Sequence, residues 1–427
     1  MTPPLARPEP WTSQVTPRQP QSVDAVTEVQ GRRGNKCSQW DGRRWCSLQR
    51  TVPAVRSLHS LDLDITEACN LACFYCFKWQ KKAVHMDEGT ARNAIDWFLE
   101  STGDYKGELK INFMGGEPLL RFDLIQKIVP YGKCRARQRG KSLHFGCTTN
   151  CTLLTEEMLE FWRRFGMGFH CSIDGVPEAQ NANRPLLSGA PSSPSIEKNA
   201  KAILAYRPEV MARATLTPRS VPYLAESAKY LVGLGFRSIT FRPAVNIGWT
   251  ASDFQVLRTQ YARLAEFYID RLVSGQRIKI DELDKGIQAL HSISSKAGPP
   301  CGAGYGLALV DPRGEIFPCH RFGPHLCGGQ FRLGRLGEPF NDRLREVFLN
   351  YNCITDTKAN CKDCCARITC HSWCYVECVD STQTLYNPGQ EYCEAMRILY
   401  DQISFVDGYL RLHHPEILNR FLKDGGV

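Results

Sequence analysis

The sequence predicts an α/β protein in which an open or partial (β/α)6 barrel precedes a small cysteine-rich domain. Two observations carry this prediction: strand-like and helical runs alternate from residue 61 to residue 242, and eleven of the 20 cysteines lie from Cys301 to Cys393. A chain of 427 residues exceeds the usual size of one compact domain, so several units are expected. No run of 18 or more apolar residues occurs, so no membrane-spanning helix is predicted.

The N-terminal residues are interpreted as a basic, largely disordered extension over residues 1–58. The first 35 or so are rich in Pro, Gln, Arg, Thr and Ser, a composition typical of disordered chains. Residues 1–60 hold nine Lys or Arg and four Asp or Glu, so the segment is either a solvated tail or an arm that attracts an acidic peptide. The first residues lack the apolar stretch of a secretion signal, so a cytoplasmic location is expected.

Six short apolar runs predict strands, and the runs between them predict helices. The expected strands are Leu61–Thr66, Leu109–Met114, Leu143–Thr149, Phe169–Ile173, Met211–Leu216 and Ser238–Arg242. The expected helices between them are Asp87–Glu100, Phe122–Val129, a helix capped by Thr155 that runs to Phe165, Ile196–Tyr206 and Pro222–Leu234. Pro130 should end or kink the second of these helices. Strands joined by crossover helices pair in parallel, so active residues should follow the carboxyl ends of the strands.

Three cysteines follow the first strand with the spacing C-x₃-C-x₂-C: Cys69, Cys73 and Cys76. Without an export signal, metal binding explains such cysteines better than disulfides do. A structural zinc site uses four ligands, and an iron–sulfur cluster is normally held by four cysteines. Three thiolates therefore leave one metal position open for a substrate or cofactor, and a zinc knuckle is the alternative.

This motif, after the first strand of six β/α units, resembles the radical S-adenosylmethionine (radical SAM) superfamily. The resemblance implies a [4Fe-4S] cluster held by Cys69, Cys73 and Cys76, with SAM chelated to the fourth iron. It also implies reductive cleavage of SAM to methionine and a 5′-deoxyadenosyl radical, which abstracts hydrogen from the substrate. The superfamily core is expected over residues 59–295, because residues 251–295 continue as helices.

Several residues resemble the family's SAM contacts. They are Gly115, Gly116 and Glu117 in a GGEP turn after the second strand, and Tyr75, Asn150, Ser172 and Arg184. An ordinary surface arginine and a strand-end hydroxyl are the alternatives for the last two. The family usually shows TNGT where this chain has Thr149-Asn150-Cys151-Thr152, and Cys151 has no assigned role.

The cysteine-dense segment, placed at residues 296–395, looks too poor in apolar core to fold without metal. Its spacing resembles the SPASM domain of peptide-modifying radical SAM enzymes, although C-x₂-C pairs also suit zinc. The resemblance implies two auxiliary [4Fe-4S] clusters, one bound by Cys361, Cys364, Cys370 and Cys393 and the other by Cys301, Cys319 and Cys374. The second set either leaves an iron open or is completed by Cys327, Cys353, Cys365 or Cys378. A helical tail is expected over residues 396–427.

His320 follows Cys319, at the position where anaerobic sulfatase maturases carry an aspartate thought to act as a base. His320 is a candidate proton acceptor, with support of the neighbouring cluster as the alternative. The Cys-His-x-Phe pattern looks more similar to maturases of cysteine-rich ribosomal peptides.

The sequence thus predicts a peptide maturase that installs a thioether or carbon–carbon cross-link. The alternatives are a sulfatase-maturase-like protein oxidase and a non-catalytic iron–sulfur electron-transfer protein. Expected partners are a precursor peptide or protein, an electron donor such as flavodoxin or ferredoxin, and a separate leader-recognition protein, because about 60 residues are too few for a fused leader-binding domain. A net charge of +9 does not indicate nucleic acid, and Cys37 and Cys46 have no assigned role.

Overall fold

The computed structural model describes residues 57–78, 80–292, 301–326, 329–349, 361, 363–370, 374–385 and 387–423. The predictions for residues 1–56 lie outside these ranges, as do those for Cys37, Cys46, Cys327 and Cys353.

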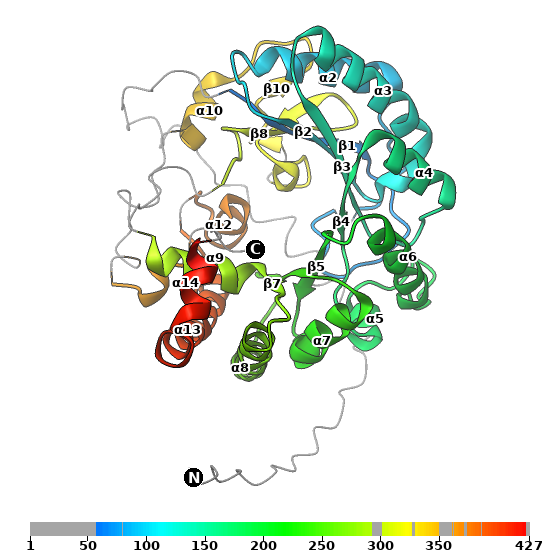
Figure 1. Cartoon of the computed structure of the whole chain (residues 1–427). Coiled ribbons are helices and arrows are strands. Elements are labelled where there is room, and N and C mark those ends of the chain that lie inside the picture. Colours follow the sequence, from blue (N-terminus) through cyan, green and yellow to red (C-terminus); the bar gives the residue numbers. More distant parts are fainter. Residues whose placement is uncertain are drawn as a thin grey trace, which may run out of the picture.

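A curved, mostly parallel sheet forms the centre of the molecule (Figure 1). Its strand order is β10-β9-β8-β1-β2-β3-β4-β5-β6-β7, with only the β8–β9 and β9–β10 pairs antiparallel. The strands are β1 (Ser60–Thr66), β2 (Leu109–Gly115), β3 (Leu143–Thr149), β4 (Gly168–Cys171), β5 (Met211–Leu216), β6 (Ser238–Pro243), β7 (Lys279–Ile280), β8 (Leu307–Val310), β9 (Glu315–Phe317) and β10 (Gly334–Arg335). The first six are the strands that the sequence predicts, in consecutive order.

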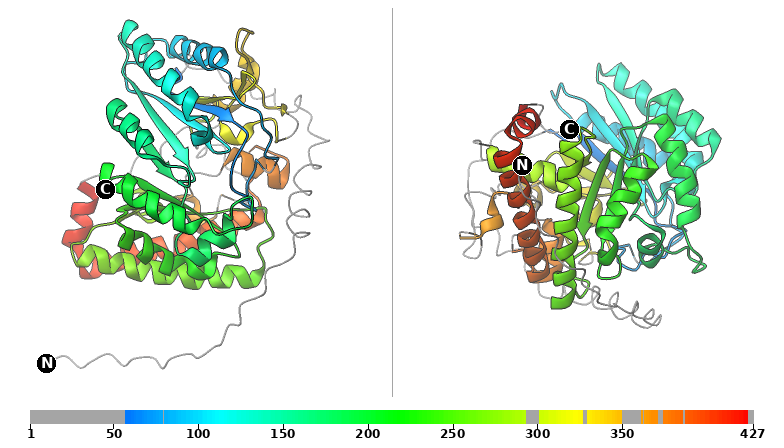
Figure 2. Two further views of the ribbon diagram at one scale, coloured as in Figure 1. Left: turned by 90° about the vertical axis from the view of Figure 1, so that its right-hand side faces the viewer. Right: turned by 60° about the horizontal axis from the view of Figure 1, so that its bottom comes forward.

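Helices cover the outer face of this sheet, as both views in Figure 2 show. They are α2 (Glu88–Ser101), α3 (Phe122–Gln138), α4 (Glu156–Phe165), α5 (Pro177–Asn183), α6 (Ser193–Tyr206) and α7 (Leu224–Leu234), followed by α8 (Ala251–Val273) and α9 (Asp281–His291). Thr155 caps α4 as predicted, by accepting a hydrogen bond from the Met158 N–H. The short helix α5 was not predicted, and Pro222 lies in a 3-10 turn that precedes α7.

The prediction that Pro130 ends or kinks α3 is wrong as to the end, because α3 continues to Gln138. Proline removes one backbone hydrogen bond from a helix interior. The helix continues because its buried face does: Gly132 and Ala136 beyond the proline pack against the sheet as Ile128 and Val129 do before it. Tertiary packing of an apolar face outweighs the local preference.

The two faces of the sheet differ in chemistry. In β1, Leu61, Leu63 and Ile65 join the main core beneath the helices. Asp62 and Asp64 alternate with them and therefore occupy the inner face, where they are only 6% and 3% exposed. The inner face is thus where polar side chains gather close to the carboxyl ends of the strands.

The C-terminal cysteine-rich region continues the same sheet, because β8 pairs in parallel with β1. Beyond the sheet it contains α10 (Asp342–Leu349), α12 (Tyr375–Thr382) and short turns. The expectation of a thin apolar core is wrong here. Phe322, Phe331, Phe348 and Tyr375 are all buried, with ring centroids 4.7 to 5.4 Å apart along the series, and we call them the aromatic core.

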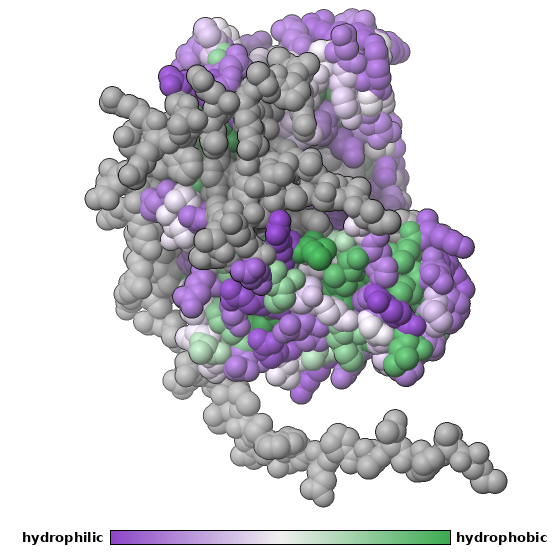
Figure 3. All heavy atoms as spheres, turned by 90° about the vertical axis from the view of Figure 1, so that its left-hand side faces the viewer, coloured by the Kyte–Doolittle hydropathy of each residue, from purple (hydrophilic) through white to green (hydrophobic). Residues whose placement is uncertain are grey.

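The helical tail begins earlier than expected, as α13 (Gln390–His413), and ends with α14 (Pro415–Lys423). It packs on α8 and α9, where Asp407 Oδ1 lies 2.5 Å from His291 Nε2. Hydrophobic side chains form scattered groups among hydrophilic ones on the lower part of the face in Figure 3. Among the described residues, no helix is long and apolar enough to span a membrane.

Candidate active site

The loop between β1 and α2 carries Cys69, Cys73 and Cys76. The Cys76 N–H donates to the Cys73 carbonyl oxygen at 3.1 Å, and Lys81 Nζ lies 3.1 Å from Cys76 Sγ. Burial raises the pKa of the Cys73 thiol to about 12; the Arg184 charge opposes this shift, and Cys76 and Cys69 add to it. The three sulfurs therefore lie close enough to interact, in a place where thiolates require a positive partner.

This donor set fits a [4Fe-4S] cluster with one iron left for another ligand. In the described part of the chain, no three His, Cys, Asp or Glu side chains converge as ligands of a single ion. A cluster makes a different demand, because each cysteine binds a different iron atom. Three mutually close thiols on one loop, of which Cys69 is buried and the other two are half-buried, fit this pattern.

The GGEP turn packs directly on the cysteine loop. The Gly116 N–H donates to the Thr66 carbonyl oxygen at 2.7 Å, and the Glu117 N–H donates to that of Ala68 at 2.8 Å. A Cβ atom at Gly116 would lie 2.0 Å from the Ala68 oxygen, and one at Gly115, whose φ is +138°, 2.2 Å from the Thr66 oxygen. Both glycines are therefore required by the close approach of two protein segments, one of which leads into Cys69.

Glu117 is fully buried and joins the ends of β2 and β3. Its carboxylate accepts hydrogen bonds from the N–H groups of Leu119 (3.0 Å) and Asn150 (2.8 Å) and from the Thr149 hydroxyl (2.8 Å). Burial raises the pKa of Glu117 to about 7, against the lowering effect of these bonds. A cationic ligand group beside this carboxylate would stabilise its charged form.

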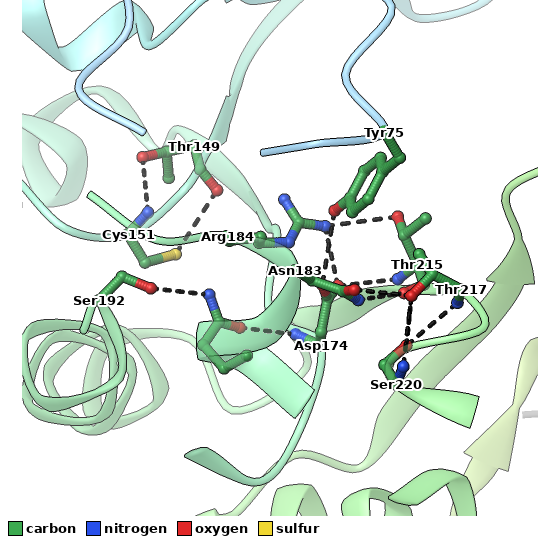
Figure 4. Close-up of polar contacts among 11 residues, drawn as sticks. Tyr75, Thr149, Cys151, Asp174, Asn183, Arg184, Ser192, Thr215, Thr217 and Ser220 are labelled. Atoms are coloured by element: carbon green, nitrogen blue, oxygen red, sulfur yellow. Dashed lines mark hydrogen bonds and ion pairs between the residues drawn. The ribbon is translucent and has the colours of Figure 1, made fainter. Parts of the chain in front are cut away.

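Asn150 and Cys151 form the turn after β3. The Asn150 amide donates to Asn70 Oδ1 at 2.9 Å and accepts from the Thr152 hydroxyl at 2.6 Å, so this turn also holds the cysteine loop. Cys151 adopts a φ of +62°, the left-handed conformation that glycine adopts most easily. Its buried thiol lies 3.7 Å from the Thr149 carbonyl oxygen, as Figure 4 shows.

Arg184 and Tyr75 meet at Asp174, a residue to which sequence analysis gave no role (Figure 4). Asp174 Oδ1 accepts from Arg184 Nη2 at 2.9 Å and from the Thr215 N–H at 2.8 Å, and Oδ2 accepts from the Tyr75 hydroxyl at 3.4 Å. The Arg184 guanidinium lies 5.4 Å from the Tyr75 ring centroid. An aspartate directly after a predicted strand was the available signal for this role.

Two hydrogen-bond donors at this end of the sheet have no hydrogen-bond partner among the described residues. Arg184 is 8% exposed, yet its buried Nε has no hydrogen-bond partner. Ser172 follows β4, with its N–H bonded to the Thr149 carbonyl oxygen, and its half-buried hydroxyl makes no hydrogen bond with the described residues. Tyr75, Asn150, Ser172 and Arg184 are thus brought to the same end of the sheet as the three cysteines.

Electrostatic interactions link the C-terminal cysteines in two groups, and the resemblance implies the same two groups. Burial, together with Cys374 and Cys301, raises the pKa of Cys319, which lies beside the aromatic core. Burial raises the pKa of Cys370 to about 12; a hydrogen bond to Tyr392 opposes the shift, and the thiols of Cys393, Cys361 and Cys364 add to it. Two of the cysteines considered as a fourth ligand beside Cys301, Cys319 and Cys374 lie among the described residues. Cys365 is exposed and Cys378 is buried.

His320 lies on the inner side of the sheet. Its Nδ1 is 2.8 Å from Oδ2 of Asp62, the buried carboxylate of β1. Sequence analysis missed Asp62, although a carboxylate alternating with leucines in a predicted strand was the signal. Next to His320, Arg321 Nη1 lies 3.3 Å from Cys374 Sγ and 2.6 Å from Glu377 Oε1.

Comparison with known sequences agrees with this geometry. Residues 63–255 match the model of the radical SAM superfamily. An uncharacterized protein of Methanocaldococcus jannaschii is 36% identical over 187 residues, which cover 44% of this chain and 63% of that protein. A serine-type anaerobic sulfatase-maturating enzyme of Klebsiella aerogenes is 22% identical over 74% of this chain and 79% of its own length. A PqqA peptide cyclase of Gluconobacter oxydans is 26% identical over 61% and 70%.

Solved structures share the fold. The structure of anSMEcpe with bound AdoMet superposes with a TM-score of 0.70 at 18% identity, covering 85% of this chain and 98% of that one. SuiB of Streptococcus suis bound to the precursor peptide SuiA gives a TM-score of 0.54 at 14% identity, covering 79% and 76%. Together with the family match, this fold identifies residues 63–255 as a radical SAM domain.

Proposed function

We propose that this protein is a radical SAM maturase that abstracts hydrogen from a ribosomally made peptide and installs a thioether or carbon–carbon cross-link. The observation that carries the proposal is the packing of the GGEP turn on the three-cysteine loop, with Glu117, Arg184 and Ser172 at the same end of the sheet. A binding or electron-transfer protein has no need for this arrangement around an open iron.

The roles of the residues follow from their contacts. Cys69, Cys73 and Cys76 would hold the cluster, which with SAM supplies the radical that starts the reaction. Glu117 would pair with the amino group of SAM, and the open Nε of Arg184 and the hydroxyl of Ser172 would bind its carboxylate. Tyr75 would pack against the adenine, and Gly115, Gly116 and Asn150 would hold the cysteine loop in place.

The C-terminal cysteines would hold two auxiliary clusters. Cys361, Cys364, Cys370 and Cys393 provide four thiols, as a closed cluster requires. Cys301, Cys319 and Cys374 provide three, and the missing ligand would come from a substrate thiolate or from a further cysteine. The reductant would be a flavodoxin or ferredoxin, and a separate protein would recognise the leader peptide.

The names of relatives and structural neighbours support a peptide substrate. Two of them name peptides, the PqqA peptide cyclase and the SuiB complex with its precursor SuiA. His320 would accept a proton from this substrate, because Asp62 Oδ2 on the inner face lies 2.8 Å from His320 Nδ1 and orients the ring.

Formylglycine-type oxidation of a protein Cys or Ser is the second candidate. Its support is the similarity to sulfatase-maturating enzymes in sequence and in fold. The residue after Cys319 favours the peptide cross-link over this oxidation. The sulfatase maturases, which the second candidate resembles, carry aspartate at this position, whereas this chain has His320.

One experiment tests the proposal. The anaerobically reconstituted protein is reduced with dithionite, incubated with SAM, and assayed for methionine and 5′-deoxyadenosine. A precursor peptide encoded beside the gene is then coexpressed and analysed by mass spectrometry. We expect SAM cleavage and a cross-linked product about 2 Da lighter than the precursor; a sulfatase-derived peptide that is oxidised instead would establish the second candidate, and no SAM cleavage would refute both.

A further inference from the structure

Three cationic or hydrogen-bonding side chains line neighbouring strands of the inner face: His170 on β4, Arg213 on β5 and Arg242 on β6. Thr215 lies two residues after Arg213 and therefore on the same face of the strand, and its register partner on β6 is Arg242. The Thr215 hydroxyl is 3.4 Å from Arg184 Nη2. These three residues thus adjoin the wall formed by Asp174, Arg184 and Tyr75, which Figure 4 shows.

Arg213 has no carboxylate partner among the described residues, and Arg242 has two long ion pairs but no hydrogen bond to a carboxylate. Arg213 is exposed on the inner face and makes no hydrogen bond or ion pair with the described residues. Arg242 is 57% exposed, and its nearest carboxylate atoms are Glu282 Oε1 at 3.6 Å and Asp281 Oδ2 at 3.8 Å, beyond hydrogen-bond distance. Desolvation by the surrounding protein and the charge of Arg242 lower the pKa of Arg213, against opposing effects of Asp62 and Asp281.

His170 provides a second, independent observation: one of its ring nitrogens lacks a hydrogen-bond partner. Its Nδ1 atom is buried and has no hydrogen-bond partner. Burial and the neighbouring Arg213 charge lower its pKa to about 4, against the raising effect of Asp62. The ring is therefore neutral near pH 7 and has a hydrogen-bonding nitrogen to offer, while Asp62 is already engaged by His320.

Guanidinium groups bind carboxylates strongly, because their planar N–H donors match the two carboxylate oxygens. The charge of Glu377 also acts on Arg242, and Glu377 bonds to Arg321 beside Cys374. The arginines therefore lie between the proposed SAM wall and the Cys301–Cys319–Cys374 group. We propose that Arg213 and Arg242 bind a carboxylate of the peptide substrate, with His170 as a third polar contact.

This proposal rests on the proposed function and names a feature of its substrate. The carboxylate comes either from an Asp or Glu side chain beside the modified residue or from the free C-terminus of the peptide. Both sources place one carboxylate on the inner face, and matched probes separate them.

The test measures binding, without turnover, to the reconstituted full chain in the presence of SAM. The probes are Ac-Gly-Glu-Gly-NH₂, Ac-Gly-Gln-Gly-NH₂ and Ac-Gly-Gln-Gly-OH, with dissociation constants from saturation-transfer NMR. We expect one of the two carboxylate probes to bind about tenfold or more tightly than the neutral probe, as a charge-assisted hydrogen bond implies. The probe that gains affinity identifies the source of the carboxylate.

The variants Arg213→Gln and Arg242→Gln should each remove most of this preference, and Arg213→Lys should restore part of it. Arg263→Gln, which changes an exposed arginine on the outer helix α8, is the matched control and should keep the preference. Equal binding of all three probes, or a preference that survives both glutamine variants, would overturn the proposal. SAM cleavage by the same preparations reports on the proposed function separately, so the two failures are distinguishable.

Discussion

The cysteine loop at residues 69–76 and the group Cys361, Cys364, Cys370 and Cys393 are both candidate cluster sites, but the protein builds them differently. Long-range bonds hold the first, since Gly116 and Glu117, directly after the next strand, bond to Thr66 and Ala68. The described backbone bonds of the second are local, such as the Cys370 N–H to the Ala366 carbonyl oxygen at 2.8 Å. The fourth cysteine of the second group, Cys393, comes from α13.

This difference predicts which of the two sites needs metal in order to fold. The first loop is fixed by a sheet that exists without a cluster, so its shape should survive metal loss. The second site joins short turns to a helix through four sulfurs, and metal binding there contributes directly to folding. The Cys301–Cys319–Cys374 group is intermediate, because Cys319 and Cys374 pack beside the aromatic core.

The largest effect is expected from Cys361→Ala, which breaks the metal-dependent site. Iron content should fall by about four atoms per chain. Amide exchange should accelerate by orders of magnitude across residues 363–370 and 374–385 and the first turn of α13, because turns with few long-range bonds lose the cluster that joins them. Exchange in β1 to β6 should stay slow, and SAM cleavage without peptide should continue.

Cys134→Ala is the control for this variant, since Cys134 is an exposed cysteine on α3 far from either group in sequence. It should change neither iron content nor exchange. If Cys361→Ala leaves residues 363–370 and 374–385 as protected as in the parent protein, then the local turns fold without metal and the contrast between the sites disappears.

Gly116→Ala attacks the sheet-supported site without touching a ligand. Its Cβ would meet the Ala68 oxygen at 2.0 Å, and a backbone atom cannot move aside as a flexible side chain can. Overpacking of this kind costs about 1–3 kcal/mol of unfolding free energy. Displacement of the chain that leads into Cys69 should also lower the yield of 5′-deoxyadenosine about tenfold or more.

Gly233→Ala provides the matched control. No atom lies within 4 Å of a Cβ at this exposed position in α7, and its φ is not left-handed. It should stabilise the protein by about 0.5–1 kcal/mol and leave SAM cleavage unchanged. Wild-type deoxyadenosine yield from Gly116→Ala would show that the glycine is not needed for the close approach.

Glu117 gives the sheet-supported site a pH dependence. Its pKa is raised from 4.5 to about 7, so the folded protein binds more protons than the unfolded chain between these values. Stability from this group is therefore greatest at low pH and falls by about 3 kcal/mol as pH rises from 4.5 to 7. Glu117→Gln should remove that component.

The measurement compares thermal unfolding midpoints of the parent protein and Glu117→Gln at pH 5 and at pH 7.5, without SAM. The difference between the two proteins should shift in favour of the variant at the higher pH. A parallel pH dependence of the two midpoints would mean that Glu117 is already ionised at pH 5 in the folded protein.

The sequence predicted the central strands well because their apolar periodicity is a local property. The candidate SAM-contacting residues were taken from the resemblance, and the structure brings them to the carboxyl end of the sheet, where parallel strands align their ends. It did not predict that β8 would extend the sheet beside β1, because a pairing between residues 60 and 307 leaves no local trace. The helix through Pro130 shows the same limit, as packing partners decided its length.

Asp174 and Asp62 show why part of the site was missed. Both were visible as carboxylates in or after strands, but their roles depend on residues far along the chain, Tyr75 and Arg184 for the first and His320 for the second. The aromatic core was missed for a related reason: its four rings are dispersed over more than 50 residues and meet only in the fold.

The last variant, Asp174→Asn, distinguishes a group of residues that supports ligand binding from one that only stabilises the fold. The molecule contains a second Asp–Arg–Tyr group on its outer surface, where Asp96 Oδ1 and Oδ2 lie 2.7 Å from Arg135 Nε and 2.6 Å from the Tyr131 hydroxyl. Asp96→Asn is therefore a chemically matched control for Asp174→Asn.

Both substitutions remove one charge-assisted hydrogen bond, worth about 1.5–3 kcal/mol where it is buried and less at the surface. The Asp96 side chain is 27% exposed and that of Asp174 fully buried, so Asp174→Asn should cost more stability. Only Asp174→Asn should weaken SAM binding, by about tenfold, because Arg184 and Tyr75 lose the carboxylate that orients them. Asp174→Glu should restore part of the affinity. Equal SAM dissociation constants for both asparagine variants would show that Asp174 supports the fold alone, and that Arg184 finds its position without it.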